Sequence, residues 1–256
     1  MTTVSFRSAT ALLLALTASA GLLLGGCAGV PPTPERSIQD PYEARNRQTY
    51  DFNEALDRNV AKPLADAYVA VTPRFVRHGV SNFFDNAAEP GYVVNSVLQG
   101  RWQDAGRGSA RFLINSTLGL LGLFDVAAAM NIESEYRDFG QTLAGWGMQE
   151  GNYLVLPLYG PSSTRDVSDI PIAMISNPVS WLQWSVAGPL YALNLINVRA
   201  SLDDAASFRD EAALDPYLFT RSAWRQYRNN LIFEGNPPVD ELYDDWDQLD
   251  LDWQAQ

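Results

Sequence analysis

The stretch RFLINSTLGLLGLFDVAAAM, residues 111–130, sets the fold of this chain. It is apolar almost throughout, and its small and polar interruptions are Ser116, Gly119, Gly122, Asn115 and Asp125. A strand is usually four to eight residues long, and a bilayer-spanning helix needs about 20 apolar residues with few charges. The stretch is too long for a strand and too interrupted for a bilayer-spanning helix. It therefore belongs to a deep protein core or to a protein that lies partly in lipid.

Residues 1–26 have the pattern of a secretory signal peptide. Arg7 precedes an uncharged apolar run at residues 11–24, which ends in Leu24-Gly25-Gly26-Cys27. Cys27 is the only cysteine of the chain, so it cannot form an internal disulfide. A leucine three residues before a cysteine resembles the bacterial lipobox, although an ordinary signal peptide that ends near a cysteine is the alternative. We predict lipidation at Cys27, because several acyl chains together anchor a protein stably.

The charge of the chain excludes one class of partner. Without residues 1–26, it carries 17 basic and 30 acidic residues, a net charge of −13. This charge argues against nucleic-acid binding and against electrostatic docking on anionic lipid. Residues 27–39 contain three prolines and predict an extended tether, and residues 40–232 show no linker or repeat and predict one domain. Residues 233–256 are acidic and contain no Lys or Arg, which predicts a flexible tail.

Helix signals dominate the predicted domain. Asp40 is expected to cap a helix that has Pro41 in its first turn and runs to about Val60, before Pro63. Downstream, Glu89-Pro90-Gly91 predicts a turn or kink, residues 203–210 a charged turn, and Asp215-Pro216 the start of a last helix. Tyr153–Leu156 is the best strand-like run, but one strand cannot form a sheet, so an extended connector is expected.

Two further patterns leave lipid contact open. Residues 170–198 contain no charged residue over 29 positions, with Trp181 and Trp184 three apart. Soluble helices normally carry charges on the water-facing side, and tryptophan clusters at headgroup level, so membrane contact is favoured over a buried helix pair. Arg107 and Arg111 lie four residues apart on one helical face. Either the two arginines bind lipid phosphates together or, as we favour, they are solvated or salt-bridged.

Catalytic signals are weak throughout. His78 is the only histidine and fits a surface or capping position, and no G-x-S-x-G or phosphate-binding glycine motif occurs. A metal site would need clustered His, Cys or carboxylates, and the acids show no such spacing. A hydrolase that uses a carboxylate pair stays an alternative, since 30 acids form many pairs. We expect no enzyme, no metal and no cofactor.

An ordered series of motifs over residues 24–230 resembles the VacJ/MlaA outer-membrane lipoproteins. The matching residues are Asp40-Pro41-Tyr42-Glu43, Asn46-Arg47, Tyr50, Phe52-Asn53, Asp57, Ser81-Asn82-Phe83, Glu89-Pro90, RFLINSTLG at residues 111–119, Gly122-Leu123-Phe124-Asp125, DFGQTL at residues 138–143, Trp146-Gly147, Gly151, Tyr153, Leu156-Pro157, Gly160-Pro161-Ser162 and Arg165-Asp166.

The resemblance implies a fold and a function. The fold is all-α, a single ring-shaped helical domain with amphipathic membrane-inserted helices and a central channel. The implied protein is lipid-anchored at the periplasmic side of the outer membrane, as Ala28 after Cys27 also suggests. It removes mislocalised phospholipids from the outer leaflet and passes them to a soluble periplasmic lipid-binding protein for retrograde transport. Members of the family associate with a trimeric outer-membrane porin. A structural lipoprotein that assists outer-membrane protein assembly is the alternative.

Two sets of candidate residues follow. The lipid-channel or gate set is Asn46, Tyr50, Phe52, Asn53, Asn115 and Asp125. The membrane-contacting set is Phe112, Leu118, Leu121, Phe124, Trp181 and Trp184. We expect the helix over residues 46–60 to be a movable channel wall, so deletion of residues 51–52 should change the lipid content of the outer leaflet. We also expect the helix of residues 111–130 to break near residues 119–122, with its polar groups turned away from acyl chains.

Overall fold

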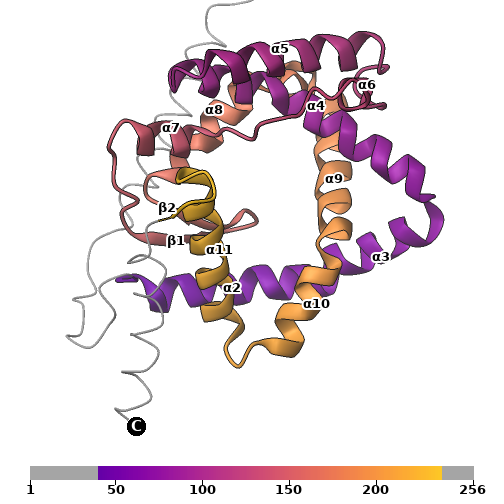
Figure 1. Ribbon diagram of the computed structural model, residues 1–256. Coiled ribbons are helices and arrows are strands. Elements are labelled where there is room, and N and C mark those ends of the chain that lie inside the picture. Colours follow the sequence, from indigo (N-terminus) through magenta and orange to yellow (C-terminus); the bar gives the residue numbers. More distant parts are fainter. Residues whose placement is uncertain (1–39, 238–256) are drawn as a thin grey trace, which may run out of the picture. The chain divides into compact units, whose positions relative to one another are not determined.

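The computed structural model describes residues 40–237, which are mostly helical (Figure 1). Its elements are α2 (Glu43–Leu56), the π-helix η2 (Asp57–Ala61), α3 (Lys62–Val71), α4 (Arg74–Leu98), α5 (Trp102–Thr117), α6 (Val126–Ala129), α7 (Phe139–Gly145), β1 (Tyr153–Leu156), β2 (Gly160–Ser163), η3 (Asp166–Ser168), α8 (Asp169–Ser176), η4 (Pro178–Trp181), α9 (Trp184–Ser201), α10 (Asp203–Ala212) and α11 (Pro216–Ile232). The predicted signal peptide, the lipidation of Cys27, the tether and the tail beyond residue 237 lie outside the described residues.

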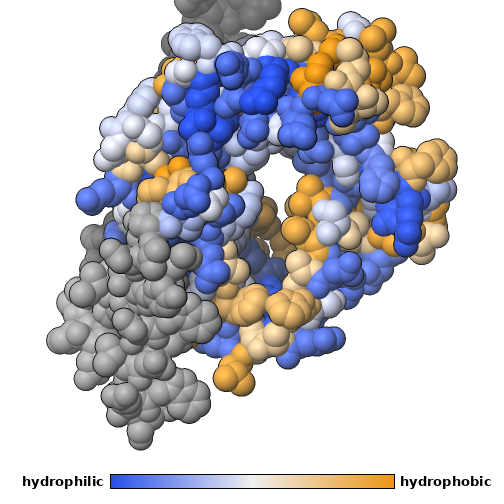
Figure 2. Space-filling model, in the orientation of Figure 1, coloured by the Kyte–Doolittle hydropathy of each residue, from blue (hydrophilic) through white to orange (hydrophobic). Residues whose placement is uncertain are grey.

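Within residues 40–237, the elements form a closed circuit around an opening. α2 packs on β1, β2 on α11, α11 on α7, α7 on α4, α4 on α9, and α9 on α3, which η2 joins to α2. Figure 1 shows the helices following one another around this circuit, and Figure 2 shows that the opening persists when all side chains are drawn. The predicted all-α, ring-shaped domain is therefore confirmed for this part of the chain.

α4 passes through the site of the predicted turn without a break. Pro90 lies inside a helix of 25 residues, so the prediction of a turn at Glu89-Pro90-Gly91 is wrong. An interior proline costs a helix about 3 kcal/mol or more, because it removes a hydrogen bond. Packing offsets that cost: Glu89 and Gly91 are both buried, and a Cβ on Gly91 would lie 2.8 Å from Oγ of Ser176 in α8. α5 approaches as closely, since a Cβ on Gly108 would lie 2.9 Å from the Val93 side chain.

The first helix also continues beyond its expected end. α2 runs through η2 directly into α3, so the predicted stop before Pro63 is wrong. Pro63 is tolerated because it lies in the first turn of α3. The hydrogen bonding changes there from the π-helical to the α-helical pattern, so the helix can continue without the N–H that proline lacks. The predicted charged turn at residues 203–210 is wrong too, because α10 begins at Asp203. Two acids in its first turn favour that helix start.

The strand-like run has a partner. β1 pairs with β2 antiparallel, with Leu156 opposite Gly160 and Tyr153 opposite Ser163, so the predicted unpaired connector is wrong. The sequence of β2, Gly160-Pro161-Ser162-Ser163, has almost no strand preference. Its pairing depends on tertiary contacts that no local pattern reveals. The last helix begins as predicted, because Asp215 caps α11 by accepting from the N–H groups of Tyr217 and Leu218.

Candidate functional site

The opening in the ring is walled on one side by α9, a helix without a polar face. Buried positions on α9 are limited to Ala187 and Asn197. Several of its large apolar side chains are exposed, namely Trp184, Val186, Leu195 and Val198. Figure 2 shows apolar surface beside the opening where Figure 1 places α9. An amphipathic surface helix normally turns polar residues to water, so an apolar helix exposed beside an opening suits contact with an apolar ligand.

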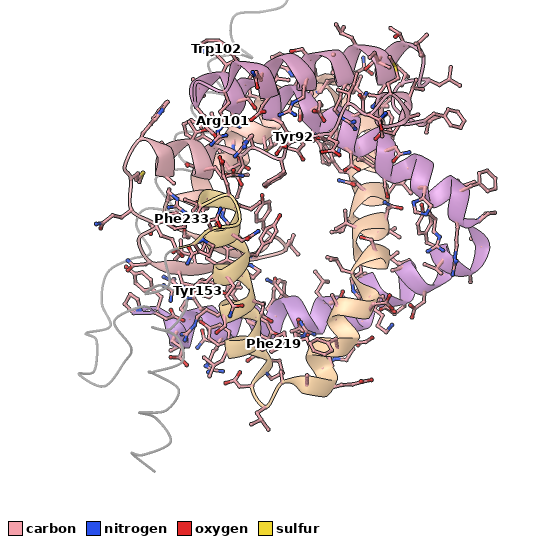
Figure 3. The ribbon with its side chains drawn as sticks, viewed as in Figure 1. Tyr92, Arg101, Trp102, Tyr153, Phe219 and Phe233 are labelled. Carbon is pink, nitrogen blue, oxygen red and sulfur yellow. The ribbon has the colours of Figure 1, made fainter. Side chains whose placement is uncertain are left out.

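Tyrosines and carboxylates contribute polar groups near this opening. Tyr92 of α4 lies at its edge in Figure 3 and packs edge-on against Tyr136, with ring centroids 5.1 Å apart. Desolvation raises the pKa of Asp85 and of Tyr159, although both side chains are exposed to solvent. Both side chains therefore have many protein neighbours although water reaches them. Desolvation also raises the pKa of Asp169, and this group interacts electrostatically with both Tyr92 and Tyr159.

An exposed apolar tip connects α5 to α6. We define the apolar tip as residues 118–124, of which Leu118, Leu121 and Phe124 are 69%, 67% and 61% exposed. Figure 2 shows apolar surface gathered in this region. The helix ends at Thr117, and φ is positive at Leu120, Leu121 and Gly122, so the predicted break of the helix near residues 119–122 is confirmed. A left-handed backbone at two leucines is unfavourable, which indicates that the surrounding structure imposes this shape.

A polar network joins the two ends of the apolar tip. Asp125 accepts hydrogen bonds from Arg111, at 2.8 Å, and from Asn115, at 3.0 Å, and it caps α6 at the N–H of Ala128. Asn115 in turn accepts from the N–H of Ala127 at 2.9 Å. Desolvation would raise the pKa of Asp125, but these hydrogen bonds outweigh it and lower that pKa.

The network decides one of the sequence predictions and leaves another open. Arg111 pairs with Asp125, and Arg107 lies 2.5 Å from Asp104, so the salt-bridged interpretation of the two arginines is confirmed. The structure joins Asn115 and Asp125 to each other and to α6. A contact of these two side chains with lipid in the channel stays a prediction.

A second exposed apolar surface lies where η4 leads into α9. Trp181 and Trp184 are 74% and 78% exposed. The indole N–H of Trp181 donates to the Ile175 carbonyl at 3.0 Å, which fixes the ring while leaving its face free. Val179, two residues before Trp181, is buried and anchors the segment in the core. Membrane contact of these tryptophans, and of the half-buried Phe112 on α5, stays a prediction.

The predicted gate residues of α2 face the β-hairpin. Asn46 donates to the carbonyl of Tyr153 and accepts from the N–H of Val155, both at 3.0 Å. Asn53 donates to the carbonyl of Leu156 and accepts from the N–H of Leu158, both at 2.9 Å. Each side-chain amide therefore bonds to one backbone carbonyl and one backbone N–H of the hairpin. We call these four hydrogen bonds the asparagine clamp.

The spacing of the clamp follows from backbone geometry. Seven residues of α-helix rise about 10.5 Å and three residues of extended chain span about 10 Å, so one amide reaches Tyr153 and Val155 within β1 and the other reaches Leu156 and Leu158 where β1 ends. Tyr50 lies between them and is buried against Tyr217 and Tyr153. Phe52 points elsewhere and is 54% exposed. The predicted role of these residues at a gate stays a prediction, to which the structure adds that α2 and the hairpin are joined.

Asp40 has a different role from the one predicted. It does not cap α2, whose N-cap is Tyr42. Its fully buried carboxylate instead accepts hydrogen bonds from Asn46, at 2.8 Å, and from the hydroxyl of Tyr217. The first residue of the described chain is thus tied to α2 and α11.

Other organising residues were missed by sequence reasoning. Arg228 of α11 binds Asp138, the cap of α7, and Asp166, at 3.0 Å, and all three side chains are nearly buried. Asp138 and Asp166 belong to the motifs of the family resemblance, but no local pattern marked Arg228 as their partner. Among residues 40–237, no group of His, Cys, Asp or Glu could hold a metal ion, and no helix is long and apolar enough to cross a membrane.

Comparisons with known proteins agree with this arrangement. The family model described as MlaA lipoprotein matches residues 38–231. The chain is similar to the intermembrane phospholipid transport system lipoprotein MlaA of Shigella flexneri, with 34% identity over 89% of this chain and 94% of the relative. It is also similar to the protein of the same name from Haemophilus influenzae, with 32% identity over 84% and 87% of the two chains.

A solved structure is similar as well. It comes from a study of the structural basis for maintenance of bacterial outer membrane lipid asymmetry. The TM-score is 0.67 at 32% sequence identity, and the match covers 78% of this chain and 100% of the solved chain.

Proposed function

Because the chain belongs to the MlaA lipoprotein family, we propose that it removes mislocalised phospholipids from the outer leaflet of the outer membrane. The lipids pass through the ring to a soluble periplasmic lipid-binding protein for retrograde transport, which maintains lipid asymmetry. One observation carries this proposal: the opening has an apolar wall at α9 and a polar group, the Tyr92 hydroxyl, from α4 at its edge (Figure 3). A phospholipid needs both kinds of surface, for its acyl chains and for its headgroup.

The position of the protein in the envelope follows from the same surfaces. We infer that Cys27 is acylated and that the apolar tip and the tryptophans of α9 and η4 enter the periplasmic leaflet. Burial of an apolar side chain of this size in hydrocarbon contributes about 1.5–3 kcal/mol, so several together hold the ring at a fixed depth. A trimeric porin is the partner that we propose within the membrane plane. The transfer step needs a path and no bond cleavage, so we propose no catalytic residue.

The test compares lipid exposure in cells that carry defined variants. Deletion of the gene should increase the labelling of phosphatidylethanolamine on intact cells by a membrane-impermeant amine reagent. The wild-type chain should reverse this increase, and Leu121→Asp in the apolar tip should not. Aspartate tolerates the positive φ of Leu121, so the change removes apolar contact without added backbone strain. Leu214→Asp is the matched control, because Leu214 is 97% exposed on the loop before α11.

Porin levels separate the proposal from its alternative. A structural lipoprotein that assists outer-membrane protein assembly predicts reduced porin in the deletion strain with normal surface labelling. That result would overturn the transport proposal. Turnover of a phospholipid by the purified chain would instead indicate an enzyme.

A further inference from the structure

A cavity of about 350 Å³ lies on the ring away from α9. It is formed where α4, α7 and α11 end and α5 begins. Figure 3 places Arg101 at the turn between α4 and α5, and Phe233 at the end of α11. The walls relevant here are the apolar Leu98, Trp146 and Phe233 and the charged Arg101, Arg137 and Glu234. A cavity of this size accommodates a small organic ligand.

Two arginines give the cavity its chemistry. Arg137 is 8% exposed, and its Nε is buried without a hydrogen-bond partner. Its guanidinium lies 3.3 Å from Glu234, 3.4 Å from Asp104 and 4.0 Å from Glu135. Arg101 pairs with Glu234 and lies 3.9 Å from Asp104. The cluster therefore holds two cations between the carboxylates of Glu234 and Asp104.

Glu234 is held in an unfavourable conformation. Its φ is +53°, in the left-handed region that residues with a Cβ rarely adopt, and Gly235 follows at +82°. The N–H of Gly235 bonds to the carbonyl of Asn230 and reverses the chain after α11. The conformation directs the carboxylate of Glu234 to both arginines. A strained residue whose side chain lies between two cations is expected where a contact forms and releases.

We propose that the Arg101–Arg137 cavity is a binding site for a phosphate group and that Glu234 occupies it as an internal competitor. The paired guanidinium groups offer several N–H donors in planar forks, which match phosphate oxygens better than a single carboxylate. Three helices end at the cavity, and their C-terminal carbonyls disfavour an anion, so binding needs both arginines. The apolar walls suit the glycerol part of a phosphate ester. The phosphate group belongs either to a lipid headgroup or to free phosphate. This inference does not depend on transport through the ring.

Isothermal titration calorimetry measures the affinity of the purified full chain, in detergent, for two water-soluble probes. One probe is inorganic phosphate, and the other is glycerophosphoglycerol, a deacylated lipid headgroup. The wild type is compared with Glu234→Gln and with the double variant Arg101→Gln/Glu234→Gln. Arg74→Gln is the matched control, because Arg74 is exposed at the start of α4 and does not line the cavity. Thermal unfolding monitors the fold of every variant.

Removal of the internal carboxylate should strengthen binding about tenfold, because a tethered competitor acts at an effective concentration in the millimolar range. The double variant should lose this gain, and Arg74→Gln should behave as the wild type. A gain for both probes supports a headgroup site, and a gain for inorganic phosphate alone supports a free-phosphate site. The proposal is overturned if Glu234→Gln binds neither probe more tightly than the wild type. It is also overturned if the double variant keeps the gain.

Discussion

Removal of the side-chain amide of Asn46 should destabilise the ring more than its single position on α2 suggests. In Asn46→Ala, three groups lose a hydrogen-bond partner: the Tyr153 carbonyl, the Val155 N–H and the Asp40 carboxylate. Asp40 and Tyr153 are both 0% exposed, so water cannot replace the lost amide there. Each unpaired buried group costs about 1–3 kcal/mol, so we expect the free energy of unfolding to fall by about 3 kcal/mol or more.

Urea unfolding of the full chain with Cys27→Ala, followed by circular dichroism, measures this change. Gln48→Ala is the control, because Gln48 is exposed on the same helix and its replacement also introduces alanine, which favours the helix at both positions. Asn53→Ala should cost less, about 1 kcal/mol, because this end of the clamp is only partly buried. If Asn46→Ala and Gln48→Ala lower the free energy of unfolding equally, the clamp does not hold the hairpin, and the reasoning fails.

Three further predictions concern the apolar surfaces and the buried charges. Gly119→Ala should destabilise the apolar tip by several kcal/mol in urea unfolding, because its Cβ would lie 2.2 Å from a backbone carbonyl oxygen. Replacement of Trp181 and Trp184 by serine should weaken the binding of the Cys27→Ala chain to vesicles at least tenfold in flotation assays, with unchanged unfolding, because both indoles are exposed. Desolvation opposes ionisation of Asp138, but Arg228 lowers the pKa of this carboxyl overall. The ionised Asp138 therefore stabilises the fold above the ordinary pKa of 3.8, and this stabilisation is lost as the pH falls below about 4. Asp138→Asn should therefore lower the free energy of unfolding at pH 7 and flatten its acid dependence.

Local patterns predicted those elements whose signals lie in neighbouring residues. The break in residues 111–130 was predictable because Gly119 and Gly122 interrupt an apolar helical run that cannot span a bilayer. The start of α11 was predictable because Asp215-Pro216 combines an N-cap with a first-turn proline. The ring shape came from the family resemblance, since no single helix pattern encodes a closed circuit.

The errors share a different cause, which is tertiary contact. Pro90 suggests a turn, but the packing of α4 against α5 and α8 keeps the helix intact. The second strand, Gly160–Ser163, has no local strand signal and depends on its pairing with β1. The cavity with Arg101 and Arg137 joins segments that are 36 positions apart and the end of α11. Residues so far apart in the sequence form no periodic pattern from which their contact could be predicted.

The clamp also changes how a movable wall at α2 should be understood. Asn46 and Asn53 lie seven residues apart, so both amides face β1 only while the helix between them keeps its length. Deletion of residues 51–52 would rotate Asn53 by about 200° relative to Asn46, since each α-helical residue turns the chain by about 100°. Leu156 and Leu158 would then lose their partners, and the hairpin would be held only at its Asn46 end. The deletion and Asn53→Ala should therefore have the same direction of effect on outer-leaflet lipid, because both release the hairpin from α2. An effect of the deletion alone would mean that the length of α2, and not the clamp, controls the path.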